Sequence, residues 1–393
     1  MLWPHPSWRN IELFWIWHYQ FLQDSGYQLR PKFHPDWKPN WKTEDDMLFS
    51  EDSLSYSNPS NMDATRIKDK KLVTLKKVSR TKFPYEVDLA LFLTSPPLSD
   101  DPKNHCVPIY EVLQSPYESD VGIIVMPRLH EFDLPDFDTV GEFLDAFRQI
   151  FDGLEFMHRN FVAHRDITIL NVMLDPSRLY PKGSHPVRPF MNAKNTFFAS
   201  HIMRTKCWPR YYLIDFESSR RYDPDKLPFD VSVAAGDRSA PEFVEIQANR
   251  DTKINPFPID VYCAANLMRK EFEIVSFNHP PLHFLLPLVD DMTQADPSLR
   301  PTISEVVTRF ATLCNSLTKS QLREPGPYAA RICQRYRRIK NTLTFVPPLP
   351  IPKFPESEAI TDSTLRSFYT LTPRVVQEHQ NVETNVQYDE AST

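Results

Sequence analysis

Aromatic and aliphatic residues recur at helical spacing near the start of the chain. One face of a helix over residues 7–24 would carry Trp8, Ile11, Phe14, Trp15, His18, Tyr19 and Leu22. The pair Ser25-Gly26 is expected to end that helix, because glycine readily takes the left-handed backbone of a helix terminus. A proline-rich run with Trp37 and Trp41 follows. We expect residues 1–50 to form an extension that docks on the main domain.

The next segment has the pattern of a β-hairpin. Short apolar runs at Ala64–Ile67 and Leu72–Val78 are separated by the charged turn at 68–71, which predicts two antiparallel strands. Tyr85–Leu93 follows a proline and is expected to be a short helix. The run Gly122–Met126 is apolar throughout and predicts a buried strand.

The second half of the chain has mainly helical periodicity. Val140–Arg159 places large apolar side chains on one stripe and predicts a long amphipathic helix. Further helices are expected at Pro258–Arg269, Pro281–Thr293 and Ile303–Leu317. Two short apolar runs, Asn171–Leu174 and Tyr211–Ile214, are of strand type. From about residue 342 the chain becomes Pro-rich and then acidic and polar, which is typical of a disordered tail.

Composition narrows the class of protein. The 393 residues are 41% hydrophobic with a formal net charge of −6, so a large core is expected and nothing demands nucleic acid or a membrane as partner. Five dispersed cysteines with no close pair indicate reduced thiols. We therefore expect a monomer in the cytoplasm or nucleus whose partner is a protein substrate or a signalling protein.

The strongest local motif lies between the long helix and the first short strand. Residues 163–174 read Ala-His-Arg-Asp-Ile-Thr-Ile-Leu-Asn-Val-Met-Leu, which fits H-R-D-x-x-x-x-N followed by an apolar strand. Phosphoryl transfer needs a carboxylate to accept the proton of the attacking hydroxyl, and Asp166 suits that role. It also needs an oxygen ligand for Mg²⁺, which Asn171 supplies.

Two further elements complete a candidate nucleotide site. The strand at 211–214 ends in Asp215-Phe-Glu, where Asp215 is a candidate second metal ligand. The run Leu-Val-Thr-Leu-Lys ends at Lys76, which is placed to neutralise phosphate charge, with Glu86 as its expected partner and Asp88 as the alternative. The sequence leaves the strand register open by one residue, so it does not decide whether Lys76 or its neighbour Lys77 faces the site.

Three later motifs appear in a fixed order after these. They are Ser-Ala-Pro-Glu ending at Glu242, Asp-Val-Tyr-Cys beginning at Asp260, and Asp-Pro-Ser-Leu-Arg-Pro-Thr containing Arg300. Together with the earlier elements, this ordered set resembles a eukaryotic-type protein kinase domain. Two flanking segments, SGYQLRPKFHPDWKPNW and DPKNHCVPI, resemble a divergent fungal kinase-like family.

The resemblance implies an α+β, two-lobed fold that binds ATP and Mg²⁺. A small β-rich N-lobe is expected at 51–129 and a larger helical C-lobe at 130–318, followed at 319–393 by a basic segment and the disordered tail. The resemblance also places Met126, Arg128 and Met173 against the nucleotide. It implies that Asp260 holds the catalytic-loop backbone and that Glu242 pairs with Arg300.

The chain departs from the kinase pattern in several places. There is no glycine between Gly26 and Gly122, so the glycine-rich phosphate loop is absent and residues 53–62 stand in its place. Glu217 replaces the glycine of D-F-G, and Thr168 stands where a lysine is usual. Three functions therefore stay open: an active Ser/Thr protein kinase, which we favour, a pseudokinase scaffold, and a small-molecule phosphotransferase of the choline-kinase or aminoglycoside-kinase type.

An insertion separates the two metal-binding candidates. Between Asn171 and Asp215 the chain is longer than a strand-turn-strand needs, which predicts an inserted segment at about 175–210. The basic and histidine residues it contains include Lys182, His185, Arg188, Lys194, Arg204, Lys206 and Arg210. We interpret it as a solvated flap, with a surface for an acidic partner as the alternative.

Overall fold

The computed structural model describes residues 12–39, 41–43, 54, 58–223, 237–244, 254–275, 280–326 and 339–347. The predicted disordered tail lies outside the described residues beyond Pro347, and so does the start of the helix predicted over residues 7–24. Val346, at the end of the last described segment, is buried.

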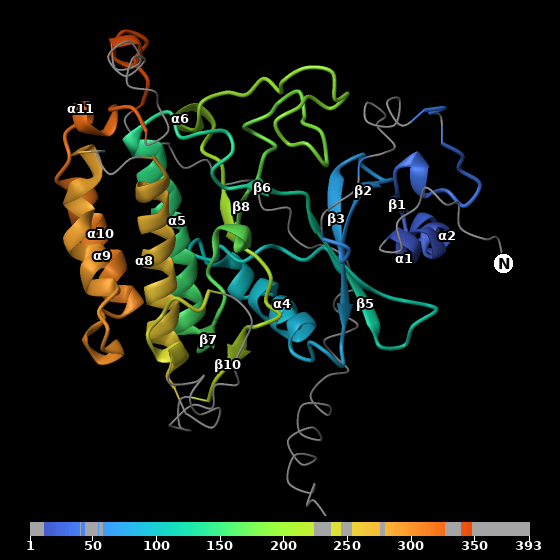
Figure 1. The fold of residues 1–393 in the computed structure, drawn as a ribbon, viewed down its shortest axis with the longest axis horizontal. Helices are drawn as coiled ribbons and strands as arrows, with labels where there is room; N and C mark the ends of the chain where they lie inside the picture. Colours follow the sequence, from blue (N-terminus) through green and yellow to red (C-terminus); the bar gives the residue numbers. More distant parts are fainter. Residues whose placement is uncertain are drawn as a thin grey trace, which may run out of the picture. The chain divides into compact units, whose positions relative to one another are not determined.

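A five-stranded antiparallel sheet contains the N-terminal strands (Figure 1). The strands are β1 (Tyr27–Gln28), β2 (Asn61–Arg66), β3 (Leu72–Ser79), β4 (Glu111–Gln114) and β5 (Val121–Pro127), and their order is β1-β2-β3-β5-β4. The predicted hairpin is confirmed, since β2 and β3 pair with Thr65 opposite Leu72. The strand predicted over Gly122–Met126 is confirmed as β5, which pairs with β3 along almost all of its length.

The N-terminal segment covers one face of this sheet. Its helices α1 (Leu13–Trp17) and α2 (Tyr19–Asp24) replace the single helix predicted there, with a break at His18. The His18 ring accounts for the break, because its Nδ1 lies 2.7 Å from the Phe14 carbonyl and Nε2 lies 2.8 Å from the Ser115 hydroxyl. Side-chain bonds of this kind compete with the regular helix.

The apolar contact between these helices and the sheet forms a cluster separate from the rest of the core. Its members include Trp15, Leu22, Leu29, Phe33, Met62, Val73, Leu75, Ile123 and Val125. Each large apolar side chain fully removed from water stabilises the fold by about 1.5–3 kcal/mol. This burial attaches residues 12–33 firmly to the sheet.

Helix α4 (Glu86–Thr94) belongs to the larger cluster, which includes residues from the opposite face of the sheet. Val87, Ala90 and Leu93 share that cluster with Val78 of β3 and Ile124 of β5. The helix predicted over Tyr85–Leu93 is therefore confirmed, with its bounds shifted by one residue. Its first residue, Glu86, is buried.

Helices make up most of the regular secondary structure in the remaining described chain. Helix α5 (Val140–Arg159) has the predicted bounds, and the Thr139 hydroxyl caps it by accepting a bond from the Glu142 N–H at 3.2 Å. Figure 1 shows α5 running beside the other long helices. The other α-helices are α6 (Arg204–Cys207), α8 (Pro256–Val275), α9 (Leu286–Met292), α10 (Ile303–Asn315) and α11 (Lys319–Leu322).

Short 3-10 helices connect several of these elements. They are η2 (Pro31–Phe33), η4 (Leu98–Asp100), η5 (Ile169–Asn171), η6 (Pro280–Leu285) and η7 (Pro297–Leu299). The helix predicted over Pro281–Thr293 is divided into η6 and α9. The division falls at Pro287, near the start of α9, because proline lacks the N–H that a continuous helix would need there.

Two small sheets connect the large sheet to the helices. One has the order β6 (His130–Glu131), β8 (Val172–Leu174) and β9 (Tyr211–Leu213), and the other pairs β7 (Val162–Ala163) with β10 (Arg220–Arg221). The two predicted strands at residues 171–174 and 211–214 are thereby confirmed as neighbours, with Val172 opposite Leu213.

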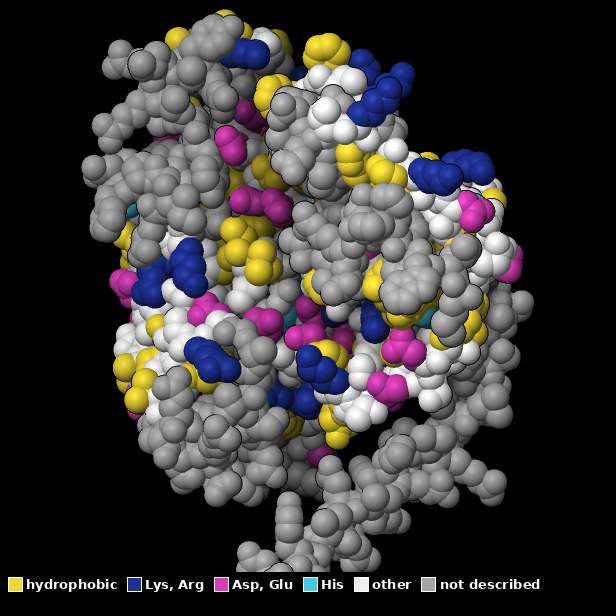
Figure 2. All heavy atoms as spheres, turned by 45° about the vertical axis from the view of Figure 1, so that its right-hand side comes forward, with side chains coloured by type: hydrophobic (Ala, Val, Ile, Leu, Met, Phe, Trp, Pro, Cys, Tyr) yellow, Lys and Arg dark blue, Asp and Glu magenta, His cyan; other side chains and the backbone are white. Residues whose placement is uncertain are grey.

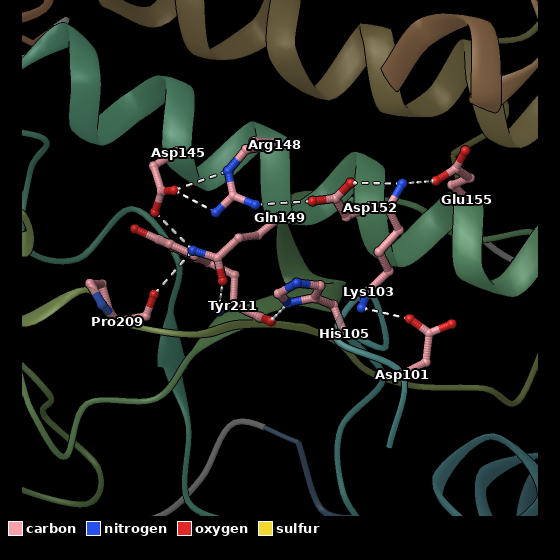
Figure 3. A network of polar contacts seen from close by, with 10 residues as sticks. All are labelled: Asp101, Lys103, His105, Asp145, Arg148, Gln149, Asp152, Glu155, Pro209 and Tyr211. Atoms are coloured by element: carbon pink, nitrogen blue, oxygen red, sulfur yellow. Dashed lines mark hydrogen bonds and ion pairs between the residues drawn. The ribbon is translucent and has the colours of Figure 1, made fainter. Parts of the chain in front are cut away.

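A polar network ties β9 to α5 (Figure 3). Gln149 of α5 accepts a bond from the Tyr211 N–H at 3.1 Å and donates to Pro209 and Asp145. His105 lies 2.8 Å from the Tyr211 carbonyl. Burial lowers the pKa of His105 to about 3, so its ring is neutral and donates to that carbonyl.

The remaining contacts of this network are ion pairs formed by Arg148 and Lys103. Arg148 pairs with Asp145 at 2.7 Å and with Asp152 at 3.0 Å, and Lys103 contacts both Asp152 and Glu155. The network therefore fixes the strand whose end leads into Asp215.

The described residues thus combine an antiparallel sheet with helices, an arrangement compatible with a kinase-like two-lobed fold. On the face drawn in Figure 2, acidic and basic side chains lie close together across the middle. In the described part of the chain, every helix is too short or too polar to cross a lipid bilayer.

Candidate active site

Lys76 lies between two carboxylates from other elements. Its Nζ is 2.5 Å from Oε1 of Glu86 on α4 and 2.7 Å from Oδ1 of Asp215, which follows β9. The register left open by the sequence is thereby decided, since Lys76 is buried while Lys77 points to the other face and lies over the Phe14 ring. Asp88, the alternative partner, is exposed.

Electrostatics keep Lys76 charged. Burial by itself would lower the pKa of the ammonium group, but the carboxylates of Asp215 and Glu86 outweigh burial and raise it. Lys76 is therefore a cation at neutral pH, held at the place where β3, α4 and β9 meet.

The backbone of Asp215 is unusual. It has a φ of +66°, in the left-handed region, which costs a residue with a Cβ about 1–2 kcal/mol. Glu217, which stands where the kinase pattern has glycine, is not among the residues with positive φ. The strained residue is the one whose carboxylate meets Lys76, and strain of this kind is concentrated at functional sites.

The loop from Asp166 to Asn171 is closed by its own side chains. Asn171 Nδ2 donates to both the carbonyl and Oδ2 of Asp166, each at 2.9 Å. Asn171 is buried and Asp166 is half-buried. The five-residue spacing of Asp166 and Asn171 in the sequence therefore lets the loop close, so that the Asn171 amide orients the Asp166 carboxylate.

Asp260 of α8 supports the backbone of this loop. Its two carboxylate oxygens accept the backbone N–H groups of His164 and Arg165, both at 2.7 Å. Arg165 has a φ of +68°, and these bonds hold the loop in that left-handed turn. The expected contact between Asp260 and the loop backbone is present.

Three hydrogen bonds join the catalytic-loop region to the segment around Asp215. His164 Nε2 lies 3.0 Å from the Ile214 carbonyl, and the Ile214 N–H donates to the Asn171 carbonyl at 3.0 Å. The Ser219 hydroxyl donates to the His164 carbonyl at 3.0 Å. Asp166, Asn171 and Asp215 therefore come together at one place.

His164 and Ser219 hold the loop against the Asp215 segment, and the sequence reasoning missed both. His164 is part of the H-R-D motif, and that motif is the signal that could have identified it. Ser219 has no comparable signal, because its role depends on the fold of the segment after Asp215.

Burial changes the acidity of two carboxyl groups here. It raises the pKa of Asp166, which favours proton uptake by that carboxylate. It also raises the pKa of Glu217, and the nearby Asp215 adds to that rise. The additional carboxylate at the D-F-G position is thus more easily neutralised than an exposed glutamate.

Three residues, Met126, Arg128 and Met173, were predicted to contact the nucleotide, and their side chains differ in burial and in hydrogen bonding. Met126 is buried near the end of β5, and Met173 is half-buried on β8. Arg128 donates instead to the carbonyls of Leu129 and Pro186. Its guanidinium group is therefore directed to the insertion.

A second buried ion pair supports the site from a distance. Arg300 makes two bonds to Glu242, at 2.6 and 2.8 Å, and both side chains are buried. The pair that the resemblance implied is therefore present, and it ties the residues before α10 to the Ala-Pro-Glu motif.

The connection from β1 to β2 spans residues 29–60. Of the residues 53–62 predicted in place of the glycine-rich loop, the first eight end this connection and the last two, Asn61 and Met62, belong to β2. Leu54 is described there, and its carbonyl accepts bonds from Arg30 at 3.1 Å and Lys32 at 3.2 Å. Lys32 also forms a buried ion pair with Glu12 at 2.7 Å. The described part of this connection is thus held by the side chains of Arg30 and Lys32.

The donor set fits Mg²⁺. Asp215 offers a carboxylate, and Asn171 offers its amide oxygen because its nitrogen donates to Asp166, and oxygen donors are what Mg²⁺ prefers. Within the described ranges no three His, Cys, Asp or Glu residues gather as a metal site. Magnesium usually takes its remaining ligands from phosphate and water.

Comparison with curated proteins finds a distant relative of this chain. No protein-family model matches the chain. Among curated proteins it is 25% identical, over 244 aligned residues, to the SNF1-related protein kinase catalytic subunit alpha KIN12 of Arabidopsis thaliana. The chain is similar to a protein kinase. The match covers 56% of this chain but only 40% of that relative's length. It supports a similarity to protein kinases in general and does not distinguish one kind of protein kinase from another.

Proposed function

We propose that this protein is an ATP- and Mg²⁺-dependent protein kinase that transfers the γ-phosphate to Ser or Thr hydroxyls of a protein. The observation that supports it best is the position of Lys76 between Glu86 and Asp215, beside the Asp166–Asn171 loop. These side chains come from four separate segments. A purely structural ion pair would not require the loop to be oriented as well.

Asp166 is the candidate base. Its carboxylate is oriented by Asn171, and burial raises its pKa, so it accepts a proton from a substrate hydroxyl more readily than an exposed aspartate does. The backbone N–H of Asp237 also interacts with this carboxylate and favours its charged form, but burial outweighs that effect.

Lys76 and Asp215 have linked roles. Lys76 binds phosphate oxygens, and to do so its ammonium exchanges Asp215 for phosphate while it keeps Glu86. Asp215 and Asn171 are the residues that would hold Mg²⁺, which when bound neutralises charge on the phosphate oxygens. The direct Lys76–Asp215 contact holds both groups ready for that exchange.

The test is phosphate transfer by the purified full chain. The wild-type protein is incubated with radiolabelled ATP and Mg²⁺ and with peptide pools that offer Ser, Thr or Tyr. We expect transfer to the Ser and Thr pools, and a fall of about 10²–10⁴-fold in Asp166→Asn, the range that general-base catalysis contributes.

Asp88→Asn is the matched control, because Asp88 is an exposed aspartate on the same helix as Glu86. It should leave the rate unchanged. Absence of transfer by wild-type protein with Mg²⁺ and with Mn²⁺ would reject the proposal.

A pseudokinase is the second candidate, and the connection from β1 to β2 favours it. Glycine lets backbone N–H groups approach phosphates closely, and this connection contains none. Thermal unfolding with ATP and Mg²⁺ separates the two candidates in part. A ligand at 100 times its Kd stabilises the fold by about 2.7 kcal/mol, so an unchanged unfolding temperature would favour a scaffold that does not bind ATP.

A further inference from the structure

The insertion between β8 and β9 has an unusual charge. Residues 176–210 contain no Asp or Glu, whereas their Lys and Arg residues are Arg178, Lys182, Arg188, Lys194, Arg204, Lys206 and Arg210. The whole chain has a formal net charge of −6, so this segment has the opposite sign to the chain as a whole. In Figure 1 it is drawn in light green beyond β6 and β8.

The insertion is folded on itself. The Ile202 N–H donates to the Leu179 carbonyl at 3.0 Å, and the His185 N–H donates to the Met191 carbonyl at 2.8 Å. A further bridge joins Met191 to Phe198. The surface is therefore formed before any partner arrives, which lowers the entropic cost of binding.

Buried contacts fasten the insertion to the rest of the molecule. The buried Arg204 donates to the carbonyls of Asp136 and Phe132, and the Ser184 hydroxyl lies 2.8 Å from His130 of β6. At the base, the Asp175 N–H donates to the Arg210 carbonyl at 2.8 Å. These contacts favour a fixed surface over the solvated flap that the sequence alone suggested.

Three phenylalanines on this folded segment face solvent. Phe190 is 50% exposed, Phe197 75% and Phe198 80%. The bridge between Met191 and Phe198 brings the rings of Phe190 and Phe198 to a centroid distance of 6.5 Å. Single exposed apolar residues are ordinary, but a group on a rigid segment is typical of an interaction surface.

Three lysines lie on the same segment. Lys182, Lys194 and Lys206 are exposed, and none forms an ion pair with another described residue. A Cβ added at Gly183 would lie 3.8 Å from Ala193, so the backbone at Lys182 is close to that at Lys194. Lys182 and Lys194 therefore flank two residues whose backbones lie close together.

We propose that this insertion surface, formed by Phe190, Phe197, Phe198, Lys182, Lys194 and Lys206, docks a protein segment in which carboxylates alternate with apolar side chains. The lysines select negative charge, and the phenylalanines supply the desolvated contact that gives affinity. The docking surface is reached from the ends of β8 and β9 opposite to Asn171 and Asp215. It does not depend on phosphoryl transfer, so a catalytically inactive protein would retain it.

Two other occupants are less well matched. Single-stranded nucleic acid also binds aromatic and basic side chains, but it favours a continuous basic groove, whereas here two of the Arg residues of the insertion are turned to backbone carbonyls of the protein. A second copy of this chain would bring the same positive charge to the interface. A peptide with acidic and apolar side chains matches both the exposed lysines and the exposed phenylalanines.

The test measures binding of a fluorescein-labelled peptide in which Glu alternates with Leu and Phe, by anisotropy with the full chain. We expect saturable binding that weakens as salt rises, and a loss of about tenfold or more in Phe197→Ser/Phe198→Ser. The charge-reversed variant Lys182→Glu/Lys194→Glu/Lys206→Glu should lose this peptide and gain one with Lys in place of Glu.

Matched controls lie elsewhere on the surface. Phe345→Ser removes an 86% exposed ring, and Lys68→Glu/Lys319→Glu/Lys340→Glu reverses three exposed lysines. Both should bind the Glu peptide as wild type does, and all variants should unfold at the wild-type temperature because the changed side chains are exposed.

Three results would overturn the inference. They are absence of binding to the Glu peptide, equal loss in the insertion and control variants, and preference for a labelled oligouridylate over the peptide. A concentration-dependent dimer that Phe197→Ser/Phe198→Ser abolishes would replace the peptide with a second copy of the chain.

Discussion

The catalytic-loop region and the connection from β1 to β2 differ in how closely they keep the kinase pattern. In the first, the Asp166 loop is held by Asn171, Asp260 and His164 through bonds of 2.7–3.0 Å. In the second, the glycines are absent and a buried ion pair between Lys32 and Glu12 holds the chain.

The difference separates two kinds of chemistry. Charges and hydrogen-bond donors on side chains can be supported by neighbouring elements, so they survive when the rest of the sequence changes. Close approach of backbone N–H groups to a phosphate depends on glycine itself. If this chain transfers phosphate, its side chains therefore do more of the phosphate binding than in a kinase with the loop.

The largest effect on stability is expected from loss of the buried ion pair between Glu242 and Arg300. Arg300→Ala leaves the buried Glu242 carboxylate without its partner, which should lower the free energy of unfolding by about 3–5 kcal/mol. Urea unfolding measures it. The double variant Arg300→Met/Glu242→Leu should recover much of the loss, and a single variant as stable as wild type would contradict the assignment of this pair as a brace.

The corresponding change in the other region is Lys32→Met. It leaves Glu12 buried without its cation, but the destabilisation should be smaller, about 3 kcal/mol, because the methionine keeps the apolar stem in place. Since this region holds none of the candidate catalytic groups, kcat of the folded protein should stay at the wild-type value. A selective fall in kcat would show that the connection takes part in catalysis.

A smaller change in stability is expected for Asp260→Asn. One of the two backbone N–H groups of the loop then faces an amide nitrogen, which should cost about 1–3 kcal/mol. Because Asp166 is displaced rather than removed, we expect kcat to fall with little change in KM for ATP. Equal changes in both constants, measured by steady-state kinetics, would argue against a positioning role.

The smallest effect concerns the turn between β2 and β3. The Arg66 guanidinium lowers the pKa of Asp69 to about 2, below the ordinary value of about 3.9. A carboxylate with a lowered folded-state pKa stabilises the fold above its unfolded pKa, and this stability is lost as pH falls from about 4 to about 2.

Asp69→Asn should therefore flatten the acid dependence of unfolding in that pH range. The side chain is partly exposed, so the difference should stay below about 1 kcal/mol. Urea unfolding at pH 7 and pH 3 measures the difference. If the free energy of unfolding changes equally between these two pH values in variant and wild type, the ion pair does not contribute to the acid dependence.

Several elements were predictable because their signals are local. The stripe of α5 and the alternation of β2 and β3 depend on residues close in sequence, and so does the spacing of Asp166 and Asn171. The break at His18 was not predictable, because it depends on a contact with Ser115, 97 residues away. The strand β1 was missed for the same reason, since only its pairing with β2 across a long connection makes it a strand.

The sequence by itself determined which chemical groups this protein has and their order along the chain. Only the tertiary structure decided that Lys76 rather than Lys77 meets Glu86 and Asp215, that Asp88 stays in solvent, and that the insertion presents its phenylalanines on a fixed surface. The physical reason is that a one-residue shift in strand register or a half-turn of a helix changes the face a side chain occupies. Packing against distant segments selects between such alternatives, and local sequence carries no record of that packing.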